Sequence, residues 1–235
     1  MPDDHYLLEH YLETATVLWS FAPSVQGGGG HPDKFGATLA GGITVFVKPA
    51  GTAPEGTRMV HNEVAAYETL KLLGWSDLTT TTVRRYFVSP ITNSTTVAAA
   101  QVLLSDVEVA PSITSLQASD VTRAATFDYL IANSDRGGQT NYLGTKGVYA
   151  TSTTQSVNHL ILIDHGYAFD FPNQQPQSIF VNERKGQPLP NSVLERVELF
   201  VLLAPSSPLP ELLGLDSFGM VVERAKDLLS IRRIE

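Results

Sequence analysis

The feature of this sequence that most constrains its fold is a change of pattern near its middle. Up to residue 104, short runs rich in β-branched and aromatic residues recur, which is typical of strands. From residue 119 onward, apolar residues recur at helical spacing, most clearly over residues 120–133. The chain is therefore expected to have a mostly β first half and a mainly helical second half, and so to belong to the α+β class.

The first half contains five predicted strands and one predicted helix. Gly41 and Gly42 separate two of the β-prone runs, and glycine readily adopts the positive φ angles that a tight hairpin turn requires. A helix is predicted at residues 62–73, where helical apolar spacing ends at Gly74. The predicted strands cover residues 14–21, 35–40, 43–48, 79–88 and 95–104.

In the second half, the predicted helix at residues 120–133 leads into a polar loop at residues 134–140. The boundary between the two halves is expected near residues 107–116, where Pro111 and small polar residues occur. The other predicted elements are short strands at residues 142–150 and 159–163 and helices near residues 193–203 and 218–231.

Composition narrows the classes of function. The net charge is −8, and an acidic chain is a poor general binder of nucleic acid or anionic membrane, because both need a positive field. The absence of cysteine excludes disulfides, thiolate metal sites and cysteine nucleophiles. The first residues lack the basic and apolar segments of a signal peptide, and no apolar run approaches the ~20 residues of a membrane helix. We therefore expect a cytoplasmic protein with no membrane span and no nucleic-acid partner.

Five polar residues occur in an order that suits the transfer of a phosphoryl group, which needs a cation on the phosphates, carboxylates on magnesium and a carboxylate near the attacking hydroxyl. Lys48 ends a predicted strand, and Glu63 on the next predicted helix is placed to pair with it. Asp135 and Asn141 share the loop after the long helix. Asp164 ends an apolar strand, where a carboxylate is unfavourable unless it is paired or binds a metal.

Each of these residues also has a purely structural interpretation. A lysine at a strand end is usually solvated, and Glu63 could simply favour the helix dipole. Asp135 and Asn141 are common turn residues. The sequence also holds a run of four glycines, Gly27, Gly28, Gly29 and Gly30. Such a run is more often a flexible loop than a phosphate cradle, and it lacks the Gly-Lys-Ser/Thr of a P-loop. The order of the polar residues on alternating element types favours the catalytic interpretation.

Four segments together resemble the phosphatidylinositol 3-/4-kinase-like and HipA-like branches of the protein-kinase-like superfamily. They are residues 47–49 (Val-Lys-Pro), 62–67 (Asn-Glu-Val-Ala-Ala-Tyr), 128–136 (Asp-Tyr-Leu-Ile-Ala-Asn-Ser-Asp-Arg) and 163–166 (Ile-Asp-His-Gly). The resemblance extends roughly from the glycine run to Phe169. It implies one kinase-like domain over residues 1–235, with a β-rich N-lobe over about residues 1–107 and a minimal C-lobe over about residues 108–235.

The resemblance also implies roles for individual residues. Lys48 would contact the phosphates of ATP, Glu63 would orient it, and the four glycines would be further nucleotide contacts. Asp135 would be the catalytic aspartate, while Asp164 and Asn141 would bind Mg²⁺ or Mn²⁺. Arg136 would either take part in catalysis or anchor the loop.

The segment from Asp135 to Asn141, called the 135–141 loop below, departs from the family pattern. It reads Asp-Arg-Gly-Gly-Gln-Thr-Asn, without the usual histidine and with a separation of six residues where the family has five. Gly137 and Gly138 are expected to absorb the extra residue as a bulge. Three functions remain open. The first is a kinase acting on a hydroxyl group, with a protein Ser/Thr favoured over a lipid. The other two are a nucleotide-binding pseudokinase that acts as an interaction module and a nucleotidyltransferase.

Overall fold

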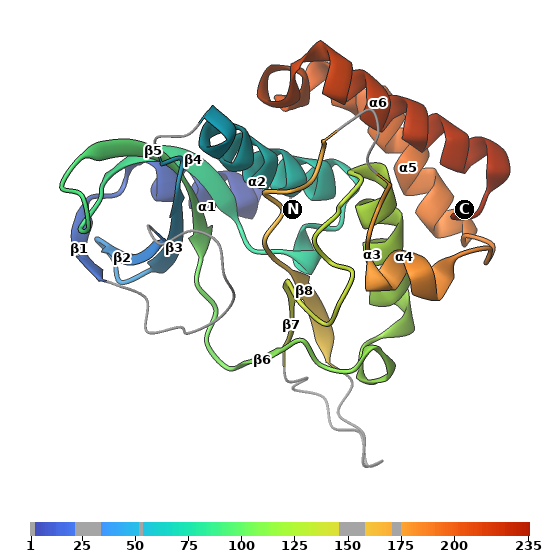
Figure 1. Cartoon of the computed structure of the whole chain (residues 1–235), viewed down its shortest axis with the longest axis horizontal. Coiled ribbons are helices and arrows are strands. Elements are labelled where there is room, and N and C mark those ends of the chain that lie inside the picture. Colours follow the sequence, from blue (N-terminus) through green and yellow to red (C-terminus); the bar gives the residue numbers. More distant parts are fainter. Residues whose placement is uncertain (1–2, 22–33, 52–53, 146–157, 171–174) are drawn as a thin grey trace. The chain divides into compact units, whose positions relative to one another are not determined.

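The computed structural model describes residues 3–21, 34–51, 54–145, 158–170 and 175–235 (Figure 1). The helices are α1 (Asp3–Thr14), α2 (Pro54–Leu72), α3 (Ala118–Leu130), α4 (Ile179–Arg184), α5 (Asn191–Leu203) and α6 (Leu209–Ile231), with short 3₁₀ helices η1 (Ser76–Leu78), η2 (Ile113–Ser115) and η3 (Ala204–Ser206). The strands are β1 (Val17–Phe21), β2 (Phe35–Leu39), β3 (Thr44–Pro49), β4 (Thr82–Val88), β5 (Thr95–Val102), β6 (Val107–Val109), β7 (Tyr142–Thr145) and β8 (His159–Leu162). The chain divides into two compact units. The first unit comprises Met1–Val64 and Thr80–Leu104, and the second unit comprises Ala65–Thr79 and Ser105–Glu235.

The first unit is built on an antiparallel sheet of five strands in the order β1-β2-β3-β5-β4. Strands β2 and β3 form the hairpin expected from the Gly-Gly pair. Gly41 and Gly42 have φ angles of 100° and 91°, and the amide of Leu39 donates to the carbonyl oxygen of Ile43 at 2.8 Å. This predicted hairpin is confirmed.

One face of this sheet packs against α1. Val47, Ala100 and Val83 lie opposite one another on β3, β5 and β4, and they are buried in one apolar cluster with Leu12 of α1. Arg85 of β4 donates from Nη1 to the carbonyl oxygen of Leu12 at 2.7 Å. This bond satisfies a carbonyl group at the C-terminal end of α1, where intrahelical donors run out.

The opposite face of the sheet carries Lys48. Because side chains alternate along a strand, Lys48 points away from the cluster around Val47 and forms a cross-strand row with Ala99 and Arg84. Ala99 is buried together with Val60 of α2. The first half of α2 therefore covers the face on which Lys48 lies.

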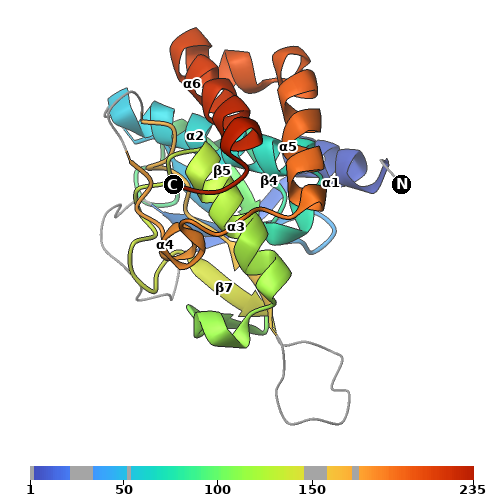
Figure 2. The same ribbon diagram turned by 90° about the vertical axis from the view of Figure 1, so that its right-hand side faces the viewer.

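The second unit is organised around α3, which packs against α4, α6 and β8. Its core includes Phe127 and Leu130 from α3, and the second half of α2 adds Leu70. Helices α5 and α6 lie side by side, as both views show (Figures 1 and 2). A small antiparallel sheet in the order β6-β7-β8 completes the unit. The prediction of a β-rich first part and a mainly helical second part is confirmed.

Several element boundaries differ from the sequence prediction. The chain forms α1 up to Thr14, and β1 begins only at Val17, whereas a strand was expected from residue 14. Among residues 6–14 of α1, only Leu12 is buried. The helix therefore has only a weak apolar pattern in the sequence. Helix α2 begins at Pro54 rather than at residue 62, because Val60, 2% exposed, already packs against the sheet. Residues 146–150 of the predicted strand lie outside the described residues.

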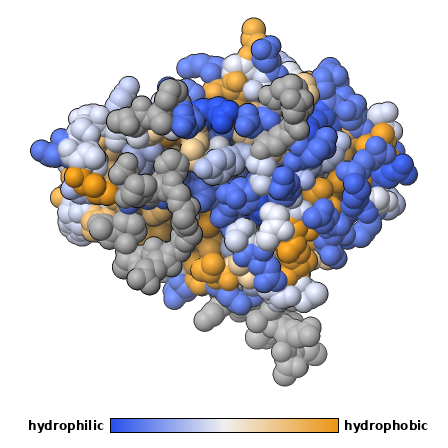
Figure 3. All heavy atoms as spheres, viewed as in Figure 1, coloured by the Kyte–Doolittle hydropathy of each residue, from blue (hydrophilic) through white to orange (hydrophobic). Residues whose placement is uncertain are grey.

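On the face seen in Figure 3, hydrophilic residues predominate and hydrophobic residues form separate patches. Within the described part of the chain, no single helix is long and apolar enough to cross a membrane. The segments Asn191–Ser206 and Leu209–Ile231 reach that length and apolarity only as a pair, bent by 116°.

Candidate functional site

In the first unit, Lys48 and Glu63 form an ion pair. Lys48 Nζ lies 2.6 Å from Glu63 Oε1, and the two side chains are only 11% and 4% exposed. β3 supplies the lysine and α2 supplies the glutamate. The predicted pairing is confirmed, and it holds a primary ammonium group at a defined position on the sheet face that α2 covers.

In the second unit, the chain leaves α3 through a sharp turn. Helix α3 ends at Leu130, and Ala132 has a φ of 48°. The side chain of Asn133 makes one hydrogen bond to the helix and one to the loop. Its Nδ2 donates to Asp128 Oδ1 at 3.1 Å, and its Oδ1 accepts from the amide of Asp135 at 3.0 Å. The 135–141 loop therefore begins from a backbone position that is set by a buried asparagine.

Asp135 and Asn141 are brought together at the two ends of this loop. Asn141 Nδ2 donates to the carboxylate Oδ2 of Asp135 at 2.9 Å and to its carbonyl oxygen at 2.6 Å. Neither Gly137 nor Gly138 has a positive φ, so the loop does not use the backbone angles that favour glycine at these two positions. Asn141 itself has a φ of 62°, a conformation that asparagine tolerates better than most residues.

Asp164 lies at the same end of the small sheet as Asn141. Asn141 directly precedes β7, and one residue, Ile163, separates Asp164 from the end of β8. The register places Tyr142 opposite Leu162. The amide of Ile163 donates to the carbonyl oxygen of Asn141 at 3.1 Å. The half-buried Asp164 has a φ of 58°. The structure thus gathers the three polar residues predicted for this unit.

The buried side chain of Arg136 connects these segments. Its side chain is 0% exposed, and Nε donates to Asp128 Oδ2 at 2.9 Å. Nη1 donates to the carbonyl oxygen of Asn141 and, at 3.2 Å, to that of Ile163. Since the guanidinium group has no exposed surface, we assign Arg136 a positioning role: it joins the 135–141 loop to the strand that ends before Asp164.

Asp128 is the functional residue that sequence reasoning missed. It is 0% exposed and accepts hydrogen bonds from Arg136, Asn133 and Ser178. A signal was present in the sequence, because Asp128 follows Ala124 by four residues and so lies on the predicted apolar face of its helix. A carboxylate at such a position needs partners, and here they are the residues that shape the loop.

Ser178 links Asp128 to α4. Its hydroxyl donates to Asp128 Oδ2 at 2.6 Å and accepts from the amides of Phe180 at 3.1 Å and Val181 at 3.4 Å, so it also caps the helix. The backbone of Arg136 pairs with this segment, donating to Gln177 at 3.1 Å.

Replacing Ser178 with alanine should lower the free energy of unfolding by about 2 kcal/mol, since a helix cap and a buried charged hydrogen bond are lost together. Chemical denaturation would measure this change. Replacement of Ser207, whose hydroxyl contacts only its own turn, is the matched control. Equal losses in the two variants would contradict a special role for Ser178.

Four of the eight described non-glycine residues with a positive φ lie around this site. Ala132, Asn141, Asp164 and Phe169 all have positive φ angles between 48° and 62°. The amide of Phe169 donates to the carbonyl oxygen of Ile131 at 2.7 Å, which ties the segment after Asp164 to the end of α3. Non-glycine residues persist in this conformation only where their surroundings over-determine it, and such residues cluster at functional sites.

The donors in this region suit Mg²⁺ or Mn²⁺ shared with a nucleotide. Because Asn141 Nδ2 is engaged by Asp135, its Oδ1 is the atom left to accept or to ligate. The carboxylate of Asp164 is the second oxygen donor. Among the described residues, no group of three or more His, Asp or Glu side chains could hold a metal alone. Mg²⁺ is commonly bound by one or two carboxylates together with substrate phosphates, so this donor set fits. Gly27, Gly28, Gly29 and Gly30 lie outside the described residues.

The comparisons with known proteins bear on the fold. The sequence matches no protein-family model, and a search of curated proteins found no match. In fold, the chain is similar to the crystal structure of a Golgi casein kinase, with a TM-score of 0.65 and 15% identity over 96% of this chain and 73% of that one. It is similar to the structure of hydra Fam20 with sugar, with a TM-score of 0.65 and 15% identity over 96% of this chain and 88% of that one. The resemblance to the phosphatidylinositol 3-/4-kinase-like and HipA-like branches stays a prediction. The chain therefore has an α+β fold similar to the folds of these two structures.

Proposed function

We propose that this chain is a phosphotransferase that uses ATP and a divalent metal and acts on a hydroxyl group, most simply a protein serine or threonine. The observation that carries the proposal is the joining of Asp135, Asn141 and the strand before Asp164 through hydrogen bonds and the buried Arg136. The network holds the carboxylate of Asp135 against Asn141 and ties both to the backbone just before Asp164, an arrangement suited to phosphoryl transfer.

Each residue has a role that its surroundings support. Asp135 would orient the attacking hydroxyl and accept its proton on the carboxylate, whose Oδ2 is held by Asn141. Lys48, oriented by Glu63, would contact phosphate oxygens. Asp164 and Asn141 Oδ1 would hold the metal, which when bound would neutralise charge on the phosphates. Arg136 would act through Asn141 rather than on the substrate.

Saturating ATP with Mg²⁺ should raise the melting temperature of the protein, because a ligand at 100 times its dissociation constant adds about 2.7 kcal/mol to the stability of the native state. Asp164→Asn should abolish most of the part that depends on metal while it keeps the fold, since asparagine tolerates the positive φ at this position. Differential scanning fluorimetry with ATP alone, Mg²⁺ alone and both would measure the effect. An unchanged melting temperature in the wild type would contradict the nucleotide site.

The acceptor and the type of transfer can be tested together. Incubation with ATP, Mg²⁺ and a mixture of Ser/Thr peptides, followed by mass spectrometry, should show an added phosphate on a peptide. Added AMP would favour a nucleotidyltransferase, and tight ATP binding without any transfer would favour a pseudokinase. A cytoplasmic location also stays a prediction, to be tested by imaging the tagged protein in cells.

A further inference from the structure

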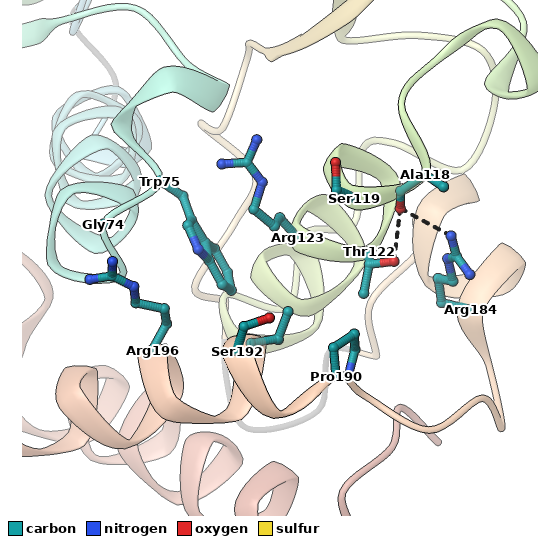
Figure 4. Close-up of a pocket in the computed structure, with 11 residues that line it drawn as sticks. Gly74, Trp75, Ala118, Ser119, Thr122, Arg123, Arg184, Pro190, Ser192 and Arg196 are labelled. Atoms are coloured by element: carbon teal, nitrogen blue, oxygen red, sulfur yellow. Dashed lines mark hydrogen bonds between the residues drawn. The ribbon is translucent and has the colours of Figure 1, made fainter.

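The second unit contains a pocket that none of the proposed catalytic residues lines. Its volume is about 510 Å³, within the range of small-molecule sites (Figure 4). Four segments form it: the turn after α2, the start of α3, the end of α4 and the start of α5. We call it the arginine pocket, and among the residues that line it are Trp75, Ser119, Thr122, Arg123, Arg184 and Arg196.

The pocket is basic in a chain whose net charge is −8. Three arginines line it, and no acidic residue does. Arg123 is already engaged, because its two Nη atoms each lie 2.9 Å from Asp77 and Nη2 lies 2.6 Å from Asp120. Burial alone would lower the pKa of Arg123, but its hydrogen bonds to these two carboxylates outweigh burial and raise it. Arg123 is therefore a fixed wall of the pocket.

Among the residues that the structure describes, Arg184 is bound only to neutral groups, and Arg196 has no bound partner. Arg184 donates to the carbonyl oxygen of Ala118 and to Gln187 Oε1, both at 3.0 Å, so its charge is not compensated by these contacts. The exposed Arg196 makes no hydrogen bond or ion pair within the described ranges of the chain. It lies beside Gly74, where a Cβ atom would come within 2.9 Å of Arg196 Nη1.

The start of α3 adds to the positive character of the pocket. Ala118 and Ser119 open this helix and line the pocket, and the N-cap residue Gln117 makes no side-chain capping hydrogen bond. Amide groups in the first turn of a helix have no intrahelical acceptor and favour anions. Asp120 in the same turn offsets part of this field, but its carboxylate is engaged by Arg123.

We propose that the arginine pocket binds an organic phosphate. Arginine forks match phosphate oxygens in pairs, and a phosphomonoester offers three acceptor oxygens and up to two charges to the guanidinium groups. Figure 4 places Arg196 and Arg184 at opposite ends of the pocket, with Trp75 between them. Trp75, Pro190 and Val193 provide apolar surface for the organic part of the ligand. This site is independent of the proposed catalytic function.

The tryptophans of the chain allow the pocket to be observed directly. The chain has two, and Trp19 is exposed in the first unit, so Trp19→Phe leaves Trp75 as the single fluorescent reporter in the pocket wall. Titration of this variant with O-phosphoserine, with a phosphoserine peptide and with the unphosphorylated peptide, at constant ionic strength, should give a saturable change for the phosphorylated probes only. Isothermal titration calorimetry of the wild type should give the same affinities.

Two further variants test the assignment. Arg196→Ala should weaken binding about tenfold or more, as expected for a charged hydrogen bond, and Arg184→Lys, which keeps the positive charge, should weaken it less. Lys226→Ala removes one exposed charge from α6 and should leave the affinity for the phosphorylated probes unchanged.

The same titrations distinguish two sources of the phosphate. Tighter binding of the phosphoserine peptide than of phosphoserine would identify a phosphorylated protein as the source, and equal binding would identify a small metabolite. Absence of saturation, or equal binding in Arg196→Ala and the Lys226→Ala control, would overturn the proposal.

Discussion

Replacing Asp135 with alanine is expected to lower the rate of phosphate transfer by about a hundredfold to ten-thousandfold, the range that loss of a general base typically produces. Binding of ATP should change little, because the carboxylate would interact with the reacting hydroxyl mainly in the transition state. The measurements are the turnover rate with saturating ATP and the affinity for ATP by calorimetry. A matched control is Asp216→Ala, which removes an exposed carboxylate from α6.

The Asp135 variant also tests the loop geometry. Asn141 donates to both the side chain and the backbone of Asp135, so the loop keeps one of these two bonds in the alanine variant. The melting temperature should therefore fall only slightly. Transfer at the wild-type rate would show that the base lies elsewhere, whereas a large fall in ATP affinity would mean that the loop had rearranged.

Replacing Arg136 with methionine is expected to destabilise the second unit by about 3–5 kcal/mol, because it leaves the carboxylate of Asp128 buried without its ionic partner. Both side chains are 0% exposed, so water cannot easily take the place of the guanidinium group. The loss should be visible as a lower midpoint in urea unfolding. We also expect the transfer rate to fall well below that of the wild type, because Arg136 fixes the backbone of Asn141 and Ile163.

A double variant separates the ion pair from simple loss of packing. Asp128→Leu combined with Arg136→Met removes both charges and should be less destabilised than the sum of the two single variants, because no buried charge is left alone. If the loss of stability in the double variant equalled the sum of the losses in the two single variants, the two residues would not be a coupled pair. Arg232→Met, at an exposed position of the second unit, controls for the chemical change.

The features that local sequence could predict are those whose causes are local. The Gly41-Gly42 pair identified the hairpin that carries Lys48, and the position of Glu63 near the start of a predicted helix anticipated the ion pair. Asp164 was noticed because a carboxylate at the end of an apolar strand needs a partner. In each case the nearest ten to twenty residues held the information.

The features that could not be predicted depend on contacts between distant residues. Ser178 reaches Asp128, a separation of 50 residues, and only the fold brings them together. Helix α4 has six residues and too short a pattern to be recognised without this serine. The positive φ of Asn141, rather than of the neighbouring glycines, follows from two bonds to Asp135 that no local propensity encodes.

Because Asn141 and Asp164 have left-handed backbone angles, glycine is a cleaner substitution than alanine for removing their side chains. Alanine at position 141 or 164 would remove the polar group and also strain the main chain, so a damaged phenotype would have two causes. Glycine at either position accepts the same φ and deletes only the side chain. At position 132 glycine would relieve strain without touching a polar group. A scan with glycine rather than alanine would thus separate chemistry from conformation, residue by residue.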